Sequence, residues 1–221
     1  MYYPLGGNAS TGGDPLTATT PNTLSVPNVA VPDASVFNFD GNSLNFGDKL
    51  GNLIGDNYTG GLSFSFWMNP DITSSEDGVF NFESNRISFV IRSNSLRLYS
   101  PSCSAGQCFS YNYTNPNNEW AHCVISFLPS GSSFYLNGQP VRTWTYTDLN
   151  VNGKDFSIGW YATTNYAYGG QLSNFQIWNT ALSESDAQTL YNNGQPLLTG
   201  TQPQAANLKA WYKFSQLAGY F

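Results

Sequence analysis

Glutamates are the first residues to test for acid–base chemistry, and this chain of 221 residues has four: Glu76, Glu83, Glu119 and Glu184. Hydrolysis of a glycosidic bond with retention needs two carboxyl groups about 5 Å apart. A Glu-x-Asp-x-Glu pattern on one strand provides them, because alternate side chains point to the same face. No glutamate here has that spacing. The sequence therefore predicts no glycosidase activity.

The single histidine offers little for other hydrolytic or lyase chemistry. His122 follows Trp120-Ala121 and so does not form the Gln-x-His pattern of a polysaccharide lyase strand. The segment Gly61-Leu-Ser63-Phe-Ser65 ends in serine, so it is not a Gly-x-Ser-x-Gly nucleophile elbow. We therefore expect the protein not to be an enzyme, with His122 in the core or in an interface.

Three cysteines can take part in redox or metal chemistry. Cys103 and Cys108 can close a small disulfide in an oxidising compartment, with modest stabilisation because the loop is short. Cys123 lies beside His122 on a predicted strand, where a buried free thiol is expected. A zinc site from the cysteines and the histidine is the alternative, although no paired Cys-x-x-Cys spacing supports it.

An aromatic loop between two predicted strands is the best candidate for ligand binding. Sugars present C–H faces that stack on aromatic rings and hydroxyls that pair with amides. The candidate residues in this loop are Trp160, Tyr161, Asn165, Tyr166 and Tyr168, and a second, weaker set contains Tyr111 and Tyr113. The alternative is that these aromatic side chains cover one end of the fold or contact a neighbouring copy.

The composition argues against several classes of protein and partner. Charged residues make up 10% of the chain and aromatic residues 16%, and a disordered chain rarely has so many aromatic side chains. Arg86, Arg92 and Arg97 are the only grouping in a chain of net charge −6, and their offsets on two strands predict no basic stripe. We therefore expect no nucleic-acid partner. No apolar run approaches the roughly 18 residues of a membrane span, and no signal peptide is visible.

Alternation and turn signals predict an all-β fold. Leu62, Phe64, Phe66 and Met68 alternate with two serines and Trp67, so one face packs and the other meets water or a second layer. Asn137-Gly138 joins two β-rich runs, 133–136 and 141–146, as a hairpin. Further short strands are predicted at 78–83, 86–92, 95–100, 120–127, 141–147, 155–160, 171–178 and 208–214. This pattern is typical of a two-sheet antiparallel β-sandwich or jelly roll.

One short helix is predicted near residues 184–192. Ser183-Glu-Ser-Asp186 is close to a capping box, and Ala187, Leu190 and Tyr191 can form a packed face. Gly194 is expected to end the helix in a left-handed conformation. The acidic residues of the first turn serve the helix dipole, so the helix is expected to cover one edge of the sandwich.

The length favours a single globular domain. Residues 6–35 are rich in Asn, Thr, Gly and Pro, with few large apolar side chains. We therefore expect residues 1–35 to form an extended strap and residues 36–221 to form the sandwich domain.

Five motifs occur in an order that resembles one family: Phe39-Asp-Gly41, Ser63-Phe-Ser-Phe-Trp67, Asn118-Glu-Trp120, Leu136-Asn-Gly138 and Trp178-Asn-Thr-Ala-Leu-Ser183. Together they resemble a laminin-G-like or pentraxin-like jelly roll of the concanavalin A-like lectin/glucanase superfamily, over roughly residues 36–214. This resemblance implies binding rather than catalysis.

The resemblance also implies a calcium site, because members of the superfamily often bind calcium through acids and amides. The acidic pairs of the family pattern are replaced here by Ser43-Leu44 and Ser173-Asn174, so we expect no required cofactor. Asp40, Asn42 and Asn45 remain the candidate calcium ligands, with an Asx turn as the alternative.

From the resemblance we expect a non-catalytic carbohydrate-binding or adhesion module of a surface or virion structural protein, extracellular or on a virion surface. Similar jelly rolls of low charge occur in marine bacteria and their phages. The alternative is a decoration or assembly module of a capsid, tail or fibre that contacts a neighbouring structural protein without binding sugar. Tyr2-Tyr-Pro-Leu-Gly-Gly-Asn8 is similar to the opening of tandem units. We therefore expect the chain to be part of a longer protein or of an oligomeric assembly.

Overall fold

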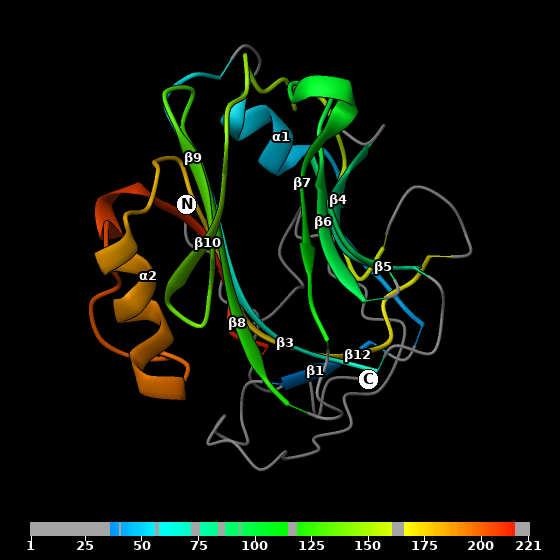
Figure 1. Ribbon diagram of the computed structural model, residues 1–221, viewed down its shortest axis with the longest axis vertical. Coiled ribbons are helices and arrows are strands. Elements are labelled where there is room, and N and C mark those ends of the chain that lie inside the picture. The colour runs from blue at the N-terminus through cyan, green and yellow to red at the C-terminus, as the bar shows by residue number, and fades with distance from the viewer. Residues whose placement is uncertain are drawn as a thin grey trace.

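The protein is a sandwich of two antiparallel sheets (Figure 1). The computed structural model describes residues 36–39, 41–55, 58–71, 76–83, 87–92, 94–114, 119–160 and 166–214. The predicted strap of residues 1–35 lies outside the described residues. The predicted all-β sandwich with one short helix near 184–192 is confirmed.

Sheet A contains, in spatial order, β1 (Val36–Asn38), β12 (Gly170–Trp178), β3 (Leu62–Pro70), β8 (Ala121–Phe127), β9 (Ser132–Leu136) and β10 (Gln139–Trp144), and β13 (Leu208–Tyr212) also pairs with β12. Sheet B contains β2 (Leu44–Asn45), β11 (Phe156–Ile158), β4 (Glu76–Phe82), β5 (Ile87–Arg92), β6 (Ser95–Tyr99) and β7 (Gln107–Asn112). The helices are α1 (Lys49–Ile54) and α2 (Glu184–Tyr191), with short 3-10 turns at Ser104–Gly106, Asn192–Gly194 and Ala205–Asn207.

Strand β3 lies in the middle of sheet A and shows why the sandwich forms. Its alternating residues Leu62, Phe64, Phe66 and Met68 are fully buried between the sheets, as predicted. The Phe64 ring stacks on Phe80 of sheet B with a centroid separation of 4.7 Å. Burial of each such side chain contributes about 1.5–3 kcal/mol, so contact between the two sheets through these side chains stabilises the fold.

The other face of β3 meets a second layer rather than water. Ser63, Ser65 and Trp67 are also buried, because α2 and the chain after it lie over sheet A (Figure 1). The hydroxyl of Ser63 donates to the Thr180 carbonyl over 2.8 Å and accepts from the Leu182 amide over 2.9 Å. These bonds tie the segment that leads into α2 to the centre of the sheet.

The hairpin predicted from Asn137-Gly138 joins β9 to β10. Both residues have positive φ, 51° and 75°, which is the conformation of a two-residue type I′ turn. The Asn137 side chain also accepts from the His122 amide over 2.8 Å, so this turn is attached to β8.

Helix α2 begins as predicted and ends differently. Ser183 is the N-cap, and a complete capping box forms with Asp186. The left-handed residue at the C-cap is Asn192 rather than Gly194, because asparagine also tolerates this conformation. Gly194 instead ends the 3-10 turn that follows.

Four elements were not predicted from the sequence: β1, β2, α1 and β7. The first three are short, and β7 has a mixed pattern of exposed and buried residues without regular alternation. Strand β10 spans 139–144 instead of 141–147, and β11 spans 156–158 instead of 155–160. None of the helices in the described part of the chain is long and apolar enough to cross a membrane.

Candidate functional site

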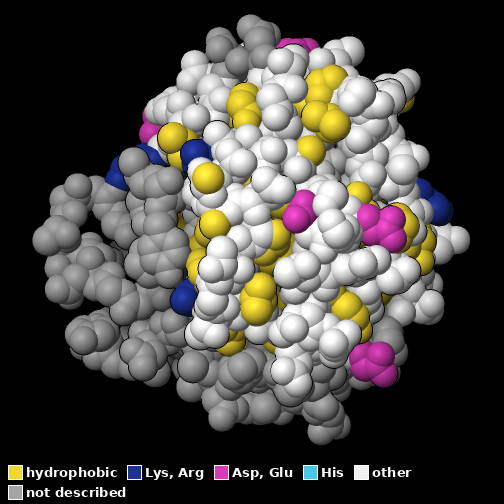
Figure 2. Space-filling view, turned by 90° about the vertical axis from the view of Figure 1, so that its left-hand side faces the viewer, with side chains coloured by type: hydrophobic (Ala, Val, Ile, Leu, Met, Phe, Trp, Pro, Cys, Tyr) yellow, Lys and Arg dark blue, Asp and Glu magenta, His cyan; other side chains and the backbone are white. Residues whose placement is uncertain are grey.

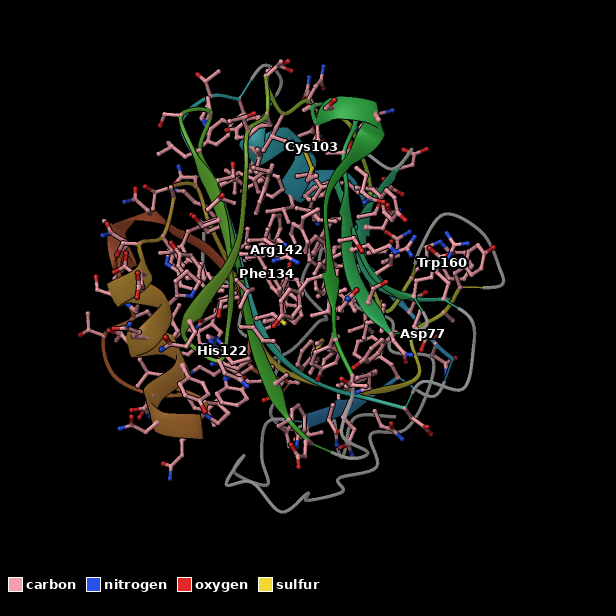
Figure 3. The ribbon with its side chains drawn as sticks, viewed as in Figure 1. Asp77, Cys103, His122, Phe134, Arg142 and Trp160 are labelled. Carbon is pink, nitrogen blue, oxygen red and sulfur yellow. A yellow bond between two sulfur atoms is a disulfide. The ribbon has the colours of Figure 1, made fainter. Side chains whose placement is uncertain are left out.

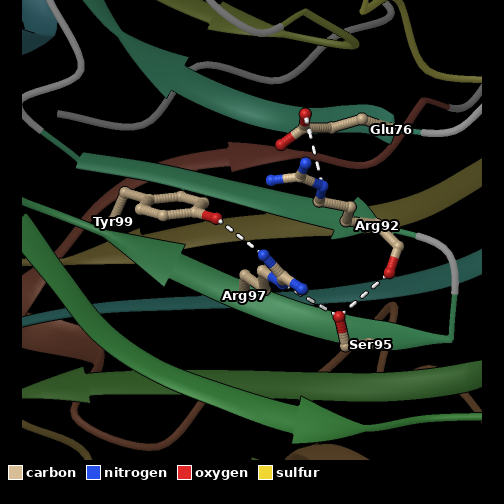
Figure 4. A network of polar contacts seen from close by, with 5 residues as sticks. All are labelled: Glu76, Arg92, Ser95, Arg97 and Tyr99. Atoms are coloured by element: carbon tan, nitrogen blue, oxygen red, sulfur yellow. Dashed lines mark hydrogen bonds and ion pairs between the residues drawn. The ribbon is translucent and has the colours of Figure 1, made fainter.

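The outer face of sheet B carries a group of polar side chains. The core-facing residues of β5 and β6, among them Phe89, Ile91, Leu96 and Leu98, are fully buried. Alternate residues therefore point away from the core. We call the group Glu76, Arg92, Ser95, Arg97 and Tyr99 the sheet B polar cluster (Figure 4).

Arg97 is held in the middle of the sheet B polar cluster by two neutral oxygens. Its Nε donates to the Ser95 hydroxyl over 3.0 Å, and its Nη1 donates to the Tyr99 hydroxyl over 3.3 Å (Figure 4). Both partners lie two residues away on the same strand, so they share its face. Because Ser95 is buried and itself donates to the Arg92 carbonyl over 2.9 Å, the Arg97 side chain is oriented before any ligand arrives.

Arg92 of this cluster has an acidic partner. Its Nε lies 4.0 Å from a carboxylate oxygen of Glu76, and the Arg92 side chain is 50% exposed while that of Glu76 is 10% exposed. The two charges offset each other, but at this distance and exposure the pair contributes little to stability.

The sequence alone does not reveal this cluster. The unlike offsets of Arg92 and Arg97 predict no shared stripe, but the register pairs Arg92 with Ser95, which places Arg97 on the same face as Arg92. Arg86 lies outside the described residues. The available signal was the alternation Ser95-x-Arg97-x-Tyr99 on one strand, which puts three polar side chains side by side.

The segment that contains the predicted aromatic loop is attached to β4 beside this cluster. The Gly159 amide donates to the Val79 carbonyl over 2.8 Å, and the Gly78 amide donates to the Tyr166 carbonyl over 3.1 Å. These bonds occur at the bulge in β4 between Gly78 and Phe80. A bulge turns the strand and redirects nearby chain, which explains why the segment joins the sheet here.

Gly159 is required where this segment begins. It has φ of +82°, and a Cβ at this position would collide with the Phe39 ring and lie 2.7 Å from the Asn42 carbonyl oxygen. Trp160 therefore follows a residue whose backbone conformation and neighbours are both fixed.

The structure places only two of the five predicted loop residues at an accessible position. Trp160 and Tyr166 are both partly exposed, and Trp160 lies on the side of the sandwich opposite α2 and His122 (Figure 3). Tyr161 and Asn165 lie outside the described residues.

Tyr168 is not part of an accessible rim, contrary to the prediction. It is fully buried in the core, and its hydroxyl donates to the Gln171 carbonyl over 3.2 Å. Burial raises the pKa of Tyr168 well above its ordinary value, and nearby Tyr113, Asp77 and Cys123 raise it further. The aromatic character of the loop predicts a binding residue here, but Tyr168 fills the end of the core instead.

The two residues of the second predicted binding set, Tyr111 and Tyr113, differ in burial. Tyr113 is buried in the core, and its pKa is raised, first by burial and then by Cys123 and Glu119. Tyr111 is partly buried, and the Arg142 guanidinium lies 5.0 Å from the centroid of its ring. Arg142 also donates to the Ser110 carbonyl over 3.2 Å, so this pair closes the side of the sandwich where β7 and β10 meet.

The candidate calcium ligands are only partly described. The Asn45 side-chain oxygen accepts from the Gly47 amide over 2.8 Å, which is an Asx turn. Asn42 is partly exposed and Asp40 lies outside the described residues. Among the residues that are described, no group of three or more His, Cys, Asp or Glu side chains could hold a metal ion. The expectation that no cofactor is required and the candidate role of these three residues as calcium ligands both stay predictions.

A disulfide joins Cys103 to Cys108. Cys123 is a free thiol and is buried, which raises its pKa. The disulfide closes the turn between β6 and β7, where the Thr147 amide donates to the Ser102 carbonyl over 3.2 Å.

His122 lies in the buried polar layer between sheet A and α2. Its Nε2 is 2.9 Å from the Ser65 hydroxyl, and its ring lies near those of Trp67 and Tyr191, with centroids 5.0 and 6.2 Å away. Burial lowers the pKa of His122 to about 3. The histidine is therefore a neutral structural residue of this layer and lies on β8 of sheet A, whereas the polar cluster lies on sheet B.

Comparison with known protein families supports this architecture. The model of the concanavalin A-like lectin/glucanases superfamily matches residues 40–188, which is more than half of the chain. No curated protein sequence matches the chain.

Solved structures show a similar fold at low sequence identity. The heptameric SAP-like pentraxin from Limulus polyphemus has a TM-score of 0.57 and 18% identity, covering 75% of this chain and 86% of the pentraxin. The binding domain of botulinum neurotoxin serotype G has a TM-score of 0.59 and 16% identity, covering 77% of this chain and 46% of that domain. The ligand binding domain of serotype D in complex with N-acetylneuraminic acid has a TM-score of 0.54 and 17% identity, covering 76% of this chain and 44% of that domain. The chain spans less than half of these toxin domains, and at such identities the likeness shows the fold alone.

Proposed function

Because the chain belongs to the concanavalin A-like lectin/glucanase superfamily, we propose that it is a non-catalytic carbohydrate-binding module. The proposed binding surface is the outer face of sheet B together with Trp160 and Tyr166. The observation that carries the proposal is that ordered, partly exposed polar groups of β6 lie near a segment attached to β4 that bears two partly exposed aromatic residues.

This combination matches the chemistry of a sugar. Hydroxyl groups pair with side-chain oxygens, amides and guanidinium groups, and the C–H faces of the ring stack on aromatic side chains. Ser95, Arg97 and Tyr99 supply ordered polar atoms. Trp160 and Tyr166 supply partly exposed aromatic rings near β4, on the far side of β5.

The placement of carboxylates supports a binding role rather than hydrolysis. Glu76 pairs with Arg92 on the outer face, whereas its neighbour Asp77 pairs in register with core-facing Ile91 and points inward. Two carboxylates that lie on opposite faces of a strand cannot flank one glycosidic bond. Glu184 is at the start of α2, far along the chain and in another layer.

The relatives support binding in general terms. One similar structure is a complex with N-acetylneuraminic acid, and others are described as receptor or ligand binding domains. We propose that this chain acts outside the reducing cytosol, on a cell or virion surface. The disulfide between Cys103 and Cys108 supports this location, because disulfides persist mainly in oxidising surroundings.

A purely structural module that contacts a neighbouring protein is the second candidate. A specific protein interface usually has an apolar centre. Among the described residues, Leu53 is the only large hydrophobic side chain that is exposed, and hydrophobic atoms form separate patches on the α2 side of the molecule (Figure 2). The described surface therefore favours a sugar over a protein as the ligand.

The test is a glycan array probed with the purified chain, followed by titration of any hit with Trp160→Ala and Thr143→Ala. Thr143 is exposed on β10 of the other sheet, so it serves as the control. We expect reproducible binding that Trp160→Ala weakens and Thr143→Ala preserves. Absence of binding to every glycan, together with a defined oligomer in light scattering, would instead establish the structural module.

A further inference from the structure

Arg97 has a fixed orientation and no acidic partner among the residues that the structure describes. Two hydrogen bonds hold its guanidinium, and both go to hydroxyl oxygens, those of Ser95 and Tyr99. Within the described residues the one ion pair is that between Arg92 and Glu76. Arg97 is therefore a cation that Ser95 and Tyr99 position and that no acidic side chain of the described residues neutralises.

The chain is acidic, so an arginine without an acidic partner among the described residues suggests the charge of a ligand. The protein has 14 Asp and Glu against 8 Lys and Arg, so acidic partners are plentiful. Among the described residues on the outer face of sheet B, Glu76 and Arg92 offset each other and Arg97 leaves one positive charge. A neutral sugar needs no such charge, whereas an anionic group gains from it.

The geometry of the guanidinium favours a carboxylate. The Nε–H and one N–H of Nη1 donate hydrogen bonds to Ser95 and Tyr99. The second N–H of Nη1 and both N–H groups of Nη2 have no partner among the described residues. These groups lie in one plane at the end of the side chain. A planar carboxylate accepts two parallel hydrogen bonds from such an edge.

Polar side chains of β7 surround this position on the side away from Trp160. Ser110 pairs in register with Arg97, and Asn112 pairs with Ser95, so both lie on the outer face. Ser110 is partly exposed and Asn112 is exposed. Their hydroxyl and amide groups can pair with sugar hydroxyls while the carboxylate is held by Arg97.

The aromatic side of the surface lies two strands from Arg97. Arg97 pairs with Val90 of β5, and Val90 pairs with Gly78 of β4, whose amide holds the Tyr166 carbonyl. Neighbouring strands are about 4.8 Å apart, so Arg97 and this segment are about 10 Å apart. A ligand that reaches both must contain more than one sugar ring.

We propose that the ligand is a glycan with a carboxylated sugar, of the sialic acid or uronic acid class, whose carboxylate binds Arg97. This inference rests on the proposed function and names its substrate class and its specificity-determining residue. Ser95 and Tyr99 are positioning residues that act through Arg97. An acidic peptide has the same charge, but the near absence of exposed apolar side chains among the described residues favours the hydroxyl-rich ligand.

The experiment is calorimetric titration of the whole chain with sialyllactose, galacturonate oligomers, lactose, a sulfated lactose and a glutamate-rich peptide. We expect one of the two carboxylated glycans to bind at least about tenfold more tightly than lactose, the size expected for a charge-assisted bidentate contact. Raising the ionic strength from about 0.01 M to about 1 M, which shortens the Debye length from about 30 Å to about 3 Å, should weaken that binding.

Four variants test the residue assignment. Arg97→Gln should abolish the preference for the carboxylated glycan, while Lys209→Gln, which removes one positive charge from β13 of the other sheet, should preserve it. Ser95→Ala and Tyr99→Phe should each reduce the preference partly, since they free the guanidinium without removing it. An unfolding temperature equal to that of the parent checks that each variant is folded.

The outcomes separate this inference from the proposed function. Equal binding of lactose and the carboxylated glycans, or a preference unchanged in Arg97→Gln, would overturn the inference and leave the carbohydrate-binding function standing. Tighter binding of the sulfated lactose would overturn the carboxylate assignment. Binding of the peptide alone, or of none of these probes with no hit on a glycan array, would overturn both.

Discussion

His122 leads to a specific dependence of stability on pH. Its pKa is about 3 in the folded protein, against about 6.5 in an unfolded chain. Between these values the unfolded chain binds a proton that the folded protein excludes. The contribution of His122 to stability is therefore complete above about pH 6.5 and is lost as the pH falls through the folded pKa.

The magnitude follows from the two pKa values. A difference of about 3.5 pKa units corresponds to a loss of about 5 kcal/mol in the free energy of unfolding once the pH is below both pKa values. At pH 4.5 the loss is about 3 kcal/mol. The structural cause is burial: the ring lies against Ser65, Trp67 and Tyr191, with none of the carboxylates of the described residues bonded to it. A loss of 3 kcal/mol is a large part of the roughly 5–15 kcal/mol of a typical domain.

Urea unfolding at pH 7.5 and pH 4.5 measures this loss in the parent and in His122→Gln. The chain has one histidine, and the variant keeps every carboxylate, so the difference between the two pH slopes reports His122 alone. We expect the parent to lose about 3 kcal/mol more than the variant. Equal losses would refute the reasoning, as would an imidazole NMR signal in the parent that titrates near pH 6.5.

Four further changes have expected outcomes. Cys108→Ser opens the disulfide to Cys103 and should lower the free energy of unfolding by about 2 kcal/mol, the chain-entropy value for so short a loop; a reducing agent should then affect only the parent. Gly159→Ala places a side chain at φ +82° and should lower the free energy of unfolding by at least about 2 kcal/mol. It should also weaken glycan binding through Trp160, and unchanged binding would show that Gly159 does not position the site. Tyr168→Phe should cost about 1 kcal/mol with glycan binding unchanged, since a drop in affinity would return Tyr168 to the site. Calcium and a chelator should give equal unfolding temperatures, because the acidic pairs of the family pattern are missing, and a rise with calcium would contradict this expectation.

Much of the fold could be predicted from local sequence patterns. The alternation in β3, the Asn137-Gly138 turn and the capping box of Ser183 each encode their structure within a few residues. Those signals are strong because side-chain alternation, positive φ and helix capping are local properties. The short strands β1 and β2 have no such signal, since they form only through pairing with distant strands.

The site was harder to predict for the same reason. The sequence selected Tyr168 as a binding residue, but whether an aromatic side chain is buried depends on what packs on it, here Phe39 from a distant part of the chain. The position of Arg97 can be read from the sequence, but its candidate role in binding depends on the register between β5 and β6 and on hydrogen bonds within β6. Composition and spacing do not determine that register.

The outer face of sheet B is the proposed glycan-binding surface. The most direct measurement is an NMR titration of the labelled chain with a glycan selected on the array. We expect saturable shifts of the Arg97 and Trp160 side-chain signals, and none near His122 on the other sheet. Shifts confined to the α2 face, or binding that persists unchanged in a double variant of Trp160→Ala and Arg97→Gln, would contradict it.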